Sequence, residues 1–332
     1  MSASHQAVLT VEDLSVRFAM PKKSLFAPRQ HLHAVRGVSF AVQEGRTLGL
    51  VGESGSGKTT TAMAAIRLVP ARSGRVLLAS DRGEDDLLAL SDEAMRRRRR
   101  DVQVIFQDPY SSLNPRERVG AIVREPLDLM QPDMPRDERE ARVRELFALV
   151  GLRDDQLGLF PHQFSGGQRQ RVSIARALAT NPKLVVCDEP VSALDVAIQA
   201  QILNLLRRLQ DELGLAYLFI SHDLGVVRYI CDDVAVMYLG EIVERAPRAE
   251  LFGRPRHPYT AALMDAAPSL ARRKSAGYRR AAAVEGDPPS PLDVPPGCVF
   301  ASRCPKRQDR CIAERPVLEP GEHAVACHFP LD

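Results

Sequence analysis

The sequence predicts an α/β protein with a mostly parallel sheet, and its apolar runs carry that prediction. Residues 183–187, 216–220 and 234–238 have the length and composition of buried strands, and helical segments lie between them. Another apolar run, Thr47–Val51, leads into a glycine-rich loop and a helical segment at Thr60–Leu68. Strands that alternate with helices form parallel sheets, because each helix crosses over and returns the chain in the same direction.

The other predicted strands follow the same reasoning. Strand patterns cover 8–18, 34–42 and 74–78, and the apolar run 102–106 is a strand that ends at Gln107.

The middle of the chain is predicted to be helical, from about 119 to 158 and again at 168–179. Within the first stretch, 140–150 places four apolar side chains on one helix face. Five consecutive arginines at 96–100 precede this region and have acidic neighbours. Such a run favours a solvated helix face over a nucleic-acid or lipid patch.

Composition limits the class of protein. The chain has 332 residues, 45% hydrophobic and 26% charged, which suits one large globular domain and a smaller one. The formal net charge of +3 gives no reason to expect nucleic acid as a partner. No apolar run approaches the roughly 20 residues of a membrane-spanning helix, and Met1–Ala7 lacks the features of a signal peptide. We therefore expect a cytoplasmic protein whose six cysteines are thiols.

Gly52–Thr59 fits the phosphate-binding pattern G-x-x-x-x-G-K-[ST] and stands between a strand and a helix, as that pattern requires. The glycines allow a tight turn that aims backbone N–H groups at phosphates, and the helix start adds partial positive charge. Lys58 would reach the β- and γ-phosphates, and the Thr59 hydroxyl would ligate Mg²⁺. A chance glycine-rich turn is the alternative. The residues predicted to bind nucleotide here are Gly52, Ser54, Gly55, Ser56, Gly57, Lys58, Thr59 and Thr60.

Two carboxylates follow the strand at 183–187. Asp188 and Glu189 stand at its carboxyl end, where parallel sheets bind ligands. Asp188 can hold Mg²⁺ directly or through water, and Glu189 can take a proton from an attacking water. An ordinary acidic turn is the alternative. Cys187, inside the strand, is predicted to be a small core residue.

A second phosphate cradle is predicted at the start of the helix at 168–179. Ser165, Gly166, Gly167 and Gln168 open this helix, and serine and glycine at a helix start present N–H groups to an anion. Alone, this stretch is merely a flexible helix cap. Its position, about twenty residues before Asp188, is what supports the prediction of a phosphate cradle here.

The motifs stand in a recognisable order along the chain. They are Gly52–Thr59, Gln107, Ser165–Gln168, Asp188-Glu189, Ser192–Asp195 and His222. In this order the chain resembles the nucleotide-binding subunit of an ABC transporter, over roughly residues 8–262. The resemblance implies an ATPase domain at 1–262, with a mostly parallel core sheet, an antiparallel β subdomain and a helical subdomain at about 108–180. A small cysteine-containing extension would occupy 263–332.

The resemblance implies catalytic roles for matched positions. Gln107 would contact Mg²⁺ and the attacking water, and Thr59 and Asp188 would also hold the metal. Glu189 would be the general base. His222 would contact the γ-phosphate and orient the site.

The resemblance also implies a head-to-tail dimer. Each ATP would lie between the P-loop of one subunit and Ser165–Gln168 of the other, with Asp195 at the dimer seam. Phe18 would stack on adenine, although a core phenylalanine would look the same.

Several stretches narrow the resemblance to the ATPases of oligopeptide and dipeptide importers. They are Phe106–Arg116, Lys22–Pro28, Arg256–Leu263, Pro295–Phe300 and Arg303–Pro305. This implies an ATPase at the cytoplasmic face of the cell membrane that energises peptide import through two permease subunits. A second, related ATPase would complete a heterodimer, and an extracytoplasmic peptide-binding protein would select cargo. The loop after Gln107 would receive a coupling helix from a permease.

Other functions stay open at this point. Related importers handle glutathione, opines, nickel complexes or sugars, so the group is better defined than the cargo. A non-transport ABC ATPase acting on DNA or ribosomes usually carries a long coiled coil or a second cassette, and this chain has one P-loop and no sustained heptads. A metal-regulatory module built on the tail is a third possibility, which the intact ATPase motifs do not favour.

Four of the six cysteines lie in the last 35 residues: Cys298, Cys304, Cys311 and Cys327. Thiolates suit Zn²⁺ or an iron–sulfur cluster, although the gaps are wider than those of zinc knuckles. Similar tails in peptide-importer ATPases are associated with a [4Fe–4S] cluster. A cluster, zinc and no metal are the alternatives here. Cys231 lies far from this set and is predicted to be a core residue.

Overall fold

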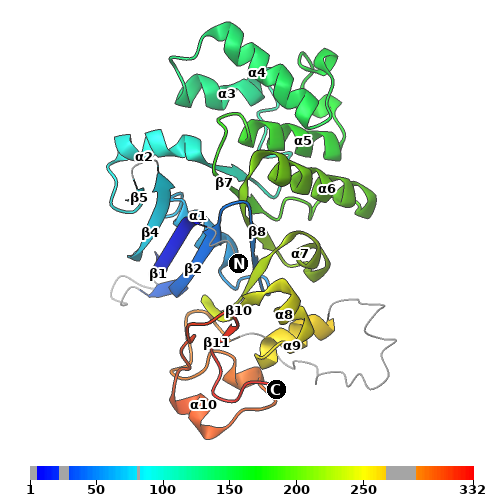
Figure 1. The fold of residues 1–332 in the computed structure, drawn as a ribbon. Helices are drawn as coiled ribbons and strands as arrows, with labels where there is room; N and C mark the ends of the chain where they lie inside the picture. The colour runs from blue at the N-terminus through cyan, green and yellow to red at the C-terminus, as the bar shows by residue number, and fades with distance from the viewer. Residues whose placement is uncertain (1–5, 22–29, 81–82, 267–288) are drawn as a thin grey trace. The chain divides into compact units, whose positions relative to one another are not determined.

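The computed structural model describes residues 6–21, 30–80, 83–266 and 289–332 (Figure 1). Lys22–Pro28, one of the stretches behind the importer resemblance, lies outside these residues. The chain divides into two compact units. Unit 1 comprises Met1–Leu9, Val42–Thr47 and Leu77–Ile220, and unit 2 comprises Thr10–Ala41, Leu48–Val76 and Ser221–Asp332.

Unit 1 is built on three parallel strands, β6 (Val102–Ile105), β7 (Leu184–Asp188) and β8 (Ala216–Ser221). β7 pairs with β6 on one side and with β8 on the other. Every residue of β7 and β8 is buried, which explains why these strands are continuous apolar runs without alternation. The predicted strands at 183–187 and 216–220 are confirmed, and the strand predicted at 102–106 ends slightly earlier.

The predicted helical region of unit 1 is two helices followed by a third. α3 (Val119–Met130) and α4 (Arg136–Leu149) are separated by a break that contains Pro132 and Pro135. The helical pattern predicted from about 119 to 158 is confirmed for these two helices, and the break between them follows from the prolines, because proline disfavours helical backbone in the residue before it. α5 (Gly166–Ala177) packs against both α3 and α4.

The run of five arginines begins in α2 (Asp92–Arg98), which Ser91 caps, and it is only partly a solvated face. Its first two arginines are exposed, as predicted. The Arg98 side chain is only 16% exposed and pairs with Asp101 at 2.6 Å and Asp85 at 3.2 Å. Arg98 thus connects α2 to β5 (Gly83–Asp86), a strand that the sequence analysis missed.

Unit 1 also contains a long helix, α6 (Val196–Leu213), which Gly214 terminates with a positive φ of 66°. Leu203, Leu206 and Leu209 are among the residues that α6 buries, while its charged positions remain exposed or half-buried. This pattern is the apolar stripe expected of a helix that covers one face of a sheet.

Most of the residues of β1 (Ala7–Ala19) and β2 (His31–Gln43) belong to unit 2. β2, β1 and β4 (Ser73–Ser80) lie in that order, and the end of β4 pairs with β5 in antiparallel fashion. Side chains of β1 and β2 alternate between buried and exposed, so this sheet has one solvated face.

Unit 2 also contains the strand that precedes the glycine-rich loop. β3 (Thr47–Val51) pairs in parallel with β9 (Asp233–Tyr238). β9 pairs antiparallel with β10 (Glu241–Pro247), and β10 pairs antiparallel with β11 (Ala324–Val325). The predicted fold class, α/β with parallel and antiparallel sheet, is confirmed, although β10 and β11 were not predicted.

The helices of unit 2 are shorter, and none of the described helices is long and apolar enough to span a membrane. The helices are α1 (Lys58–Ala65), α7 (Leu224–Ile230), α8 (Arg248–Gly253), α9 (Pro258–Ala266) and α10 (Asp309–Ala313).

An aromatic cluster anchors the C-terminal tail, defined here as residues 289–332, within unit 2. Phe300 is fully buried, and its ring lies 5.3 Å from that of Tyr238 and 5.4 Å from that of Tyr259. Edge and tilted contacts of this kind are favourable beyond the apolar area they bury. The tail is therefore a packed part of unit 2.

His257 is buried beside this cluster as a neutral imidazole. Its Nδ1 accepts a hydrogen bond from the Tyr259 N–H at 3.0 Å, and burial lowers its pKa to about 3. Its backbone N–H donates to Glu244, whose carboxylate also accepts from the Arg256 N–H and contacts His323 at 2.7 Å.

We expect the free energy of unfolding to fall as the pH drops from about 7 to about 5. The unfolded His257 has an ordinary pKa of 6.5 and takes up a proton that the folded imidazole does not accept. The contribution of His257 to the free energy of unfolding is therefore fully present above its unfolded pKa of 6.5. It is lost as the pH falls toward the folded pKa of about 3, by up to roughly 1.4 kcal/mol per pH unit. Urea unfolding at several pH values measures the slope.

The matched variant is His257→Asn, whose side-chain oxygen can replace Nδ1 as the acceptor for the Tyr259 N–H. Its free energy of unfolding should depend less on pH over the same range. Equal slopes for the variant and the wild type would show that His257 does not control this dependence.

Candidate functional site

The loop predicted to bind phosphate is a tight turn between β3 and α1. Gly52, Gly55 and Gly57 have φ values of 151°, 79° and 100°, which favour glycine. A Cβ on Gly52 would lie 2.2 Å from the Met237 carbonyl oxygen, and one on Gly57 would lie 2.5 Å from that of Ala34. Two glycines of the pattern are therefore required by close backbone contacts as well as by conformation.

The loop curls around the ammonium group of Lys58, the first residue of α1. The Lys58 side chain is buried, and its Nζ donates to the carbonyl oxygens of Gly52 and Glu53, both at 2.9 Å. Ser56 is also buried, and its hydroxyl has no hydrogen-bond partner within the described residues. A buried cation and an unpartnered hydroxyl at the start of a helix fit a phosphate group.

Glu53, an unassigned position of the predicted loop, makes contacts that the sequence analysis missed. Its carboxylate accepts two hydrogen bonds from Arg303, at 2.9 and 3.2 Å, and its backbone N–H donates to the Tyr259 hydroxyl at 2.9 Å. Both partners lie in stretches quoted for the importer resemblance, Arg256–Leu263 and Arg303–Pro305, which is the one signal that could have found them.

In unit 1, two predicted catalytic residues lie together. Asp188, the last residue of β7, is buried, and Glu189 follows it half-buried. Gln107 donates from Nε2 to Glu189 Oε2 at 3.0 Å, across 82 positions of sequence. The amide and the carboxylate therefore form one polar pair beside the end of β7.

The backbone of Glu189 is held in an unusual conformation. Its φ is +46°, in the left-handed region, which costs a side-chain-bearing residue roughly 1–3 kcal/mol. Its N–H donates to the Ile220 carbonyl at 3.1 Å, and its carbonyl accepts from the Ser192 hydroxyl at 3.0 Å. These bonds at both ends fix the direction in which the carboxylate projects.

The stretch predicted as a second phosphate cradle is a complete helix cap. The Ser165 hydroxyl accepts from the Gln168 N–H at 3.3 Å, and the Gln168 side chain accepts from the Ser165 N–H at 3.0 Å. A Cβ on Gly167 would lie 2.5 Å from Ile198 of α6, so glycine is required there. Asp195 is exposed and caps α6 through the Ile198 N–H at 3.0 Å.

Comparison with known proteins decides the family. The ABC transporter family matches residues 35–192, and the family described as oligopeptide/dipeptide transporter, C-terminal region, matches residues 243–311. The oligopeptide transport ATP-binding protein OppF of Salmonella typhimurium is 47% identical over 329 residues, covering 97% of this chain and 96% of that protein. This chain belongs to the ABC transporter family. The resemblance inferred from the motifs is confirmed.

Other relatives agree. The oligopeptide transport ATP-binding protein AppF of Bacillus subtilis is 45% identical over 99% of both chains. The dipeptide transport ATP-binding protein DppF of Escherichia coli is 44% identical over 98% of this chain and 95% of its own. Among solved structures, a dimeric ATP-binding cassette, MJ0796, bound to ADP and Pi has a TM-score of 0.62 and 28% identity. It covers 72% of this chain and 98% of its own, and the chain is thus an ABC ATPase.

Two more predicted nucleotide-site residues of this ABC ATPase lie in unit 2. His222 is exposed directly after β8, and the next residue, Asp223, caps α7 by accepting from the Gly225 N–H at 2.7 Å. Phe18, near the end of β1, is 38% exposed, whereas Phe40 in β2 is 2% exposed. The alternative reading of Phe18 as a core phenylalanine is therefore wrong.

The four tail cysteines line one small cavity in unit 2. Burial raises the pKa of Cys298 to about 11, and it also raises the pKa of Cys304 and of Cys327. The thiols of Cys298, Cys304 and Cys327 therefore stay protonated at neutral pH unless a ligand displaces the protons. The cavity, of about 10 Å³, has room for about one water molecule. Its cysteines are Cys298, Cys304, Cys311 and Cys327.

This arrangement gives the predicted [4Fe–4S] cluster no support. Among the described residues, no group of three or more His, Cys, Asp or Glu side chains could hold a metal ion. The thiol chemistry suits a soft metal, but the cysteines close around a space too small for a cluster. The other two cysteines, Cys187 and Cys231, are fully buried core residues, as predicted.

Proposed function

We propose that this ABC ATPase hydrolyses ATP to power the uptake of di- or oligopeptides through a membrane permease. The observation that carries the proposal is the match of residues 243–311 to the C-terminal region of oligopeptide/dipeptide transporters. That region includes residues 289–311 of the packed tail and Tyr259, whose hydroxyl accepts a hydrogen bond from the P-loop, so the match covers a working part of unit 2.

Unit 2 would hold the phosphates of ATP. The buried Lys58 ammonium and the unpartnered Ser56 hydroxyl would meet the phosphate oxygens at the start of α1. Thr59, Gln107 and Asp188 would hold Mg²⁺, which when bound neutralises negative charge on the phosphates. Phe18, which exposes its ring, would stack on adenine.

Unit 1 would supply the hydrolytic groups. Glu189 would accept a proton from the attacking water, and Gln107, which donates to its carboxylate, would orient that water. The fixed backbone of Glu189 would hold the base in place without reorganisation during the reaction. His222 would contact the γ-phosphate from the end of β8.

ATP would be hydrolysed between two subunits. The Ser165–Gln168 stretch of one subunit would close over the P-loop of the other, with the exposed Asp195 at the seam. The dimeric solved relative supports this arrangement. We infer that the partner is a second, related ATPase, so that the working unit is a heterodimer.

The remaining partners would be membrane proteins. Two permease subunits would bind this chain at the cytoplasmic face of the cell membrane, and an extracytoplasmic binding protein would deliver the peptide. The loop after Gln107 would receive a permease helix. In that loop Tyr110 is 63% exposed, and the Arg169 guanidinium stacks 3.9 Å from the centre of its ring.

An affinity pull-down from gently solubilised membranes tests the proposal. We expect two polytopic permeases and a second ATPase to be recovered, and the associated binding protein to bind short peptides. Recovery of ribosomes or nucleic acid without a permease would contradict a role in transport. Binding of glutathione, an opine or a nickel complex, but no peptide, would keep the ATPase role and change the cargo.

A metal in the tail is a second, separate proposal that rests only on four thiols around one cavity. We infer that a [4Fe–4S] cluster, or else a single Zn²⁺ ion, binds these thiols only if the cysteines move apart from the arrangement described above, in which the space between them is too small for a cluster. Anaerobic purification followed by iron, sulfide and zinc analysis decides between them. A protein that contains none of these, and that has no broad absorption near 400 nm, would have a tail of free thiols only.

A further inference from the structure

The contact between Glu53 and Arg303 joins the C-terminal tail to the nucleotide site. The Arg303 guanidinium donates Nη1 to Glu53 Oε2 and Nη2 to Glu53 Oε1, a two-pronged pair, and it also reaches the Tyr238 hydroxyl at 3.2 Å. The Arg303 side chain is only 9% exposed, so solvent screens this pair weakly. Glu53 is 33% exposed.

The P-loop is held at Glu53 by both its side chain and its backbone. The Tyr259 hydroxyl accepts the Glu53 N–H, and the Glu53 carbonyl accepts from Lys58 Nζ at 2.9 Å. A continuous series of hydrogen bonds therefore runs from Arg303 through Glu53 to the lysine that would meet the phosphates. Arg303 donates its backbone N–H to the carbonyl of the fully buried Phe300 at 3.0 Å, so the tail side of this series is anchored in the core of unit 2.

Charge gives the contact a second consequence. A carboxylate in a phosphate-binding loop repels the anionic ligand, and the cost is greatest where water is scarce. The Arg303 guanidinium neutralises that carboxylate. Because it binds both carboxylate oxygens, it also holds the carboxylate in one orientation. Removing Arg303 alone would leave Glu53 charged, unpaired and free to face the phosphates.

We propose that Arg303 is a positioning residue for the nucleotide site: the tail holds the P-loop and neutralises Glu53, so nucleotide affinity depends on the tail. The proposal rests on the proposed function only in taking the P-loop as the ATP site. It does not depend on the cargo, so a wrong cargo would leave it intact.

The test measures the MgATP affinity of the full chain by equilibrium titration. Arg303→Ala should raise the Kd by roughly tenfold, the range expected for losing a charge-assisted pair. Adding Glu53→Gln to Arg303→Ala should recover most of that loss, because the repelling charge is then gone.

The matched control is Arg310→Ala, which removes a tail arginine from an exposed pair with Glu314. It should leave the Kd unchanged. An unchanged Kd in folded Arg303→Ala, or a double variant that binds no better than Arg303→Ala, would overturn the proposal. Should Arg303→Ala fail to fold, Glu53→Gln alone decides, because the proposal requires it to bind MgATP at least as tightly as the wild type.

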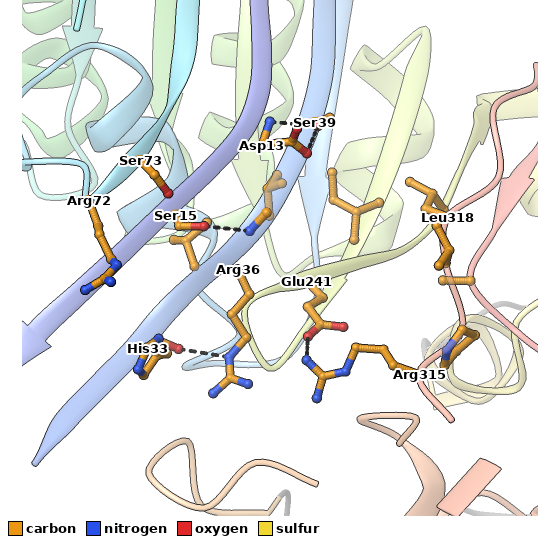
Figure 2. A pocket seen from close by; sticks show the side chains of 17 residues that line it. Asp13, Ser15, His33, Arg36, Ser39, Arg72, Ser73, Glu241, Arg315 and Leu318 are labelled. Atoms are coloured by element: carbon orange, nitrogen blue, oxygen red, sulfur yellow. Dashed lines mark hydrogen bonds and ion pairs between the residues drawn. The ribbon is translucent and has the colours of Figure 1, made fainter. Parts of the chain in front are cut away.

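A different observation concerns a cavity in unit 2. It measures about 690 Å³ and lies between β1, β2, β10 and the tail segment 315–318 (Figure 2). This is the size of ordinary small-molecule sites. Its wall combines arginines and serines with apolar side chains such as Leu318.

Arg36 forms no ion pair of its own among the described residues, because the nearby Glu241 carboxylate, which acts on it electrostatically, is paired with Arg315. Glu241 pairs with Arg315 at 2.8 Å, and Arg315 donates its other groups to the carbonyls of Pro295 and Gly297. Arg36 donates only from Nε, to the His33 carbonyl, and its two terminal nitrogens have no acceptor within the described residues. Burial and the nearby Arg315 lower the pKa of Arg36, as expected for a half-buried positive charge.

We infer that this cavity binds a small molecule that carries a carboxylate or phosphate, and that the Arg36 guanidinium binds this anionic group. The inference is independent of the nucleotide site. Isothermal titration of the full chain with succinate and with inorganic phosphate, in excess MgADP to fill the P-loop, tests it. Binding of one probe alone identifies which of the two anions the site takes.

Arg36→Gln should weaken binding of the active probe by roughly tenfold. Arg75→Gln, which removes an exposed arginine outside the cavity, should leave it unchanged. The inference fails when neither probe binds, or when Arg36→Gln binds as well as the wild type does.

Discussion

Replacing Glu189 by glutamine is expected to leave ATP binding intact, trap the ATP-bound dimer and reduce hydrolysis by about 10²–10⁴-fold. Glutamine keeps the size of the side chain, and its oxygen can still accept the hydrogen bond from Gln107. It cannot take a proton from water, so the chemical step loses its base. Phosphate release by the assembled complex, together with size-exclusion chromatography in ATP, measures both effects.

The control is Glu212→Gln, the same change on the exposed surface of α6, where Glu212 is 46% exposed and pairs with Arg208. Its turnover should stay within about twofold of the wild type, since exposed pairs contribute little. Near-normal phosphate release by Glu189→Gln would reject Glu189 as the base, and the pair with Gln107 would then be structural.

The backbone of Glu189 illustrates what the sequence can and cannot predict. Two carboxylates after an apolar run predict a ligand at the end of a parallel strand, because composition and periodicity are local signals. The φ of +46° is not local information. It is imposed by hydrogen bonds to Ile220 and Ser192, and neither bond has a sequence signature.

The same distinction applies to the fold. β7 and β8 were predicted nearly residue for residue, since strands buried on both faces are apolar throughout. β10 was missed because it follows β9 after a tight turn and carries charged residues, including the buried Glu244. β11 is two residues long and exists only through its pairing with β10.

Composition and periodicity contain no sign of the link from the tail to the P-loop. Glu53 and Arg303 are separated by 250 positions, and a lone glutamate in a glycine-rich loop gives no hint of a partner. The resemblance pointed to both regions but assigned no role to either residue. Contacts of this kind follow from how β9, β10 and the tail pack, which periodicity does not describe.

Replacing Lys58 by methionine is expected to raise the Kd for MgATP by roughly 10–100-fold, the value of one strong charge-assisted contact. Methionine matches the length and apolar stem of lysine, so the change isolates the ammonium. That ammonium already holds the carbonyls of Gly52 and Glu53, so we also expect the free energy of unfolding to fall by roughly 1–3 kcal/mol without nucleotide.

These two effects separate the roles of Lys58 as a ligand and as a support for the loop. A support role alone would lower the melting temperature, yet added MgATP would still raise it as in the wild type. A ligand role predicts that this ATP-dependent rise disappears. Lys306→Met is the control, because Lys306 is exposed and, among the residues that the structure describes, donates only to the Pro330 carbonyl. It should keep both the melting temperature and its response to MgATP. An undiminished response in Lys58→Met would therefore assign the lysine to the loop and leave phosphate binding to the backbone N–H groups at the start of α1.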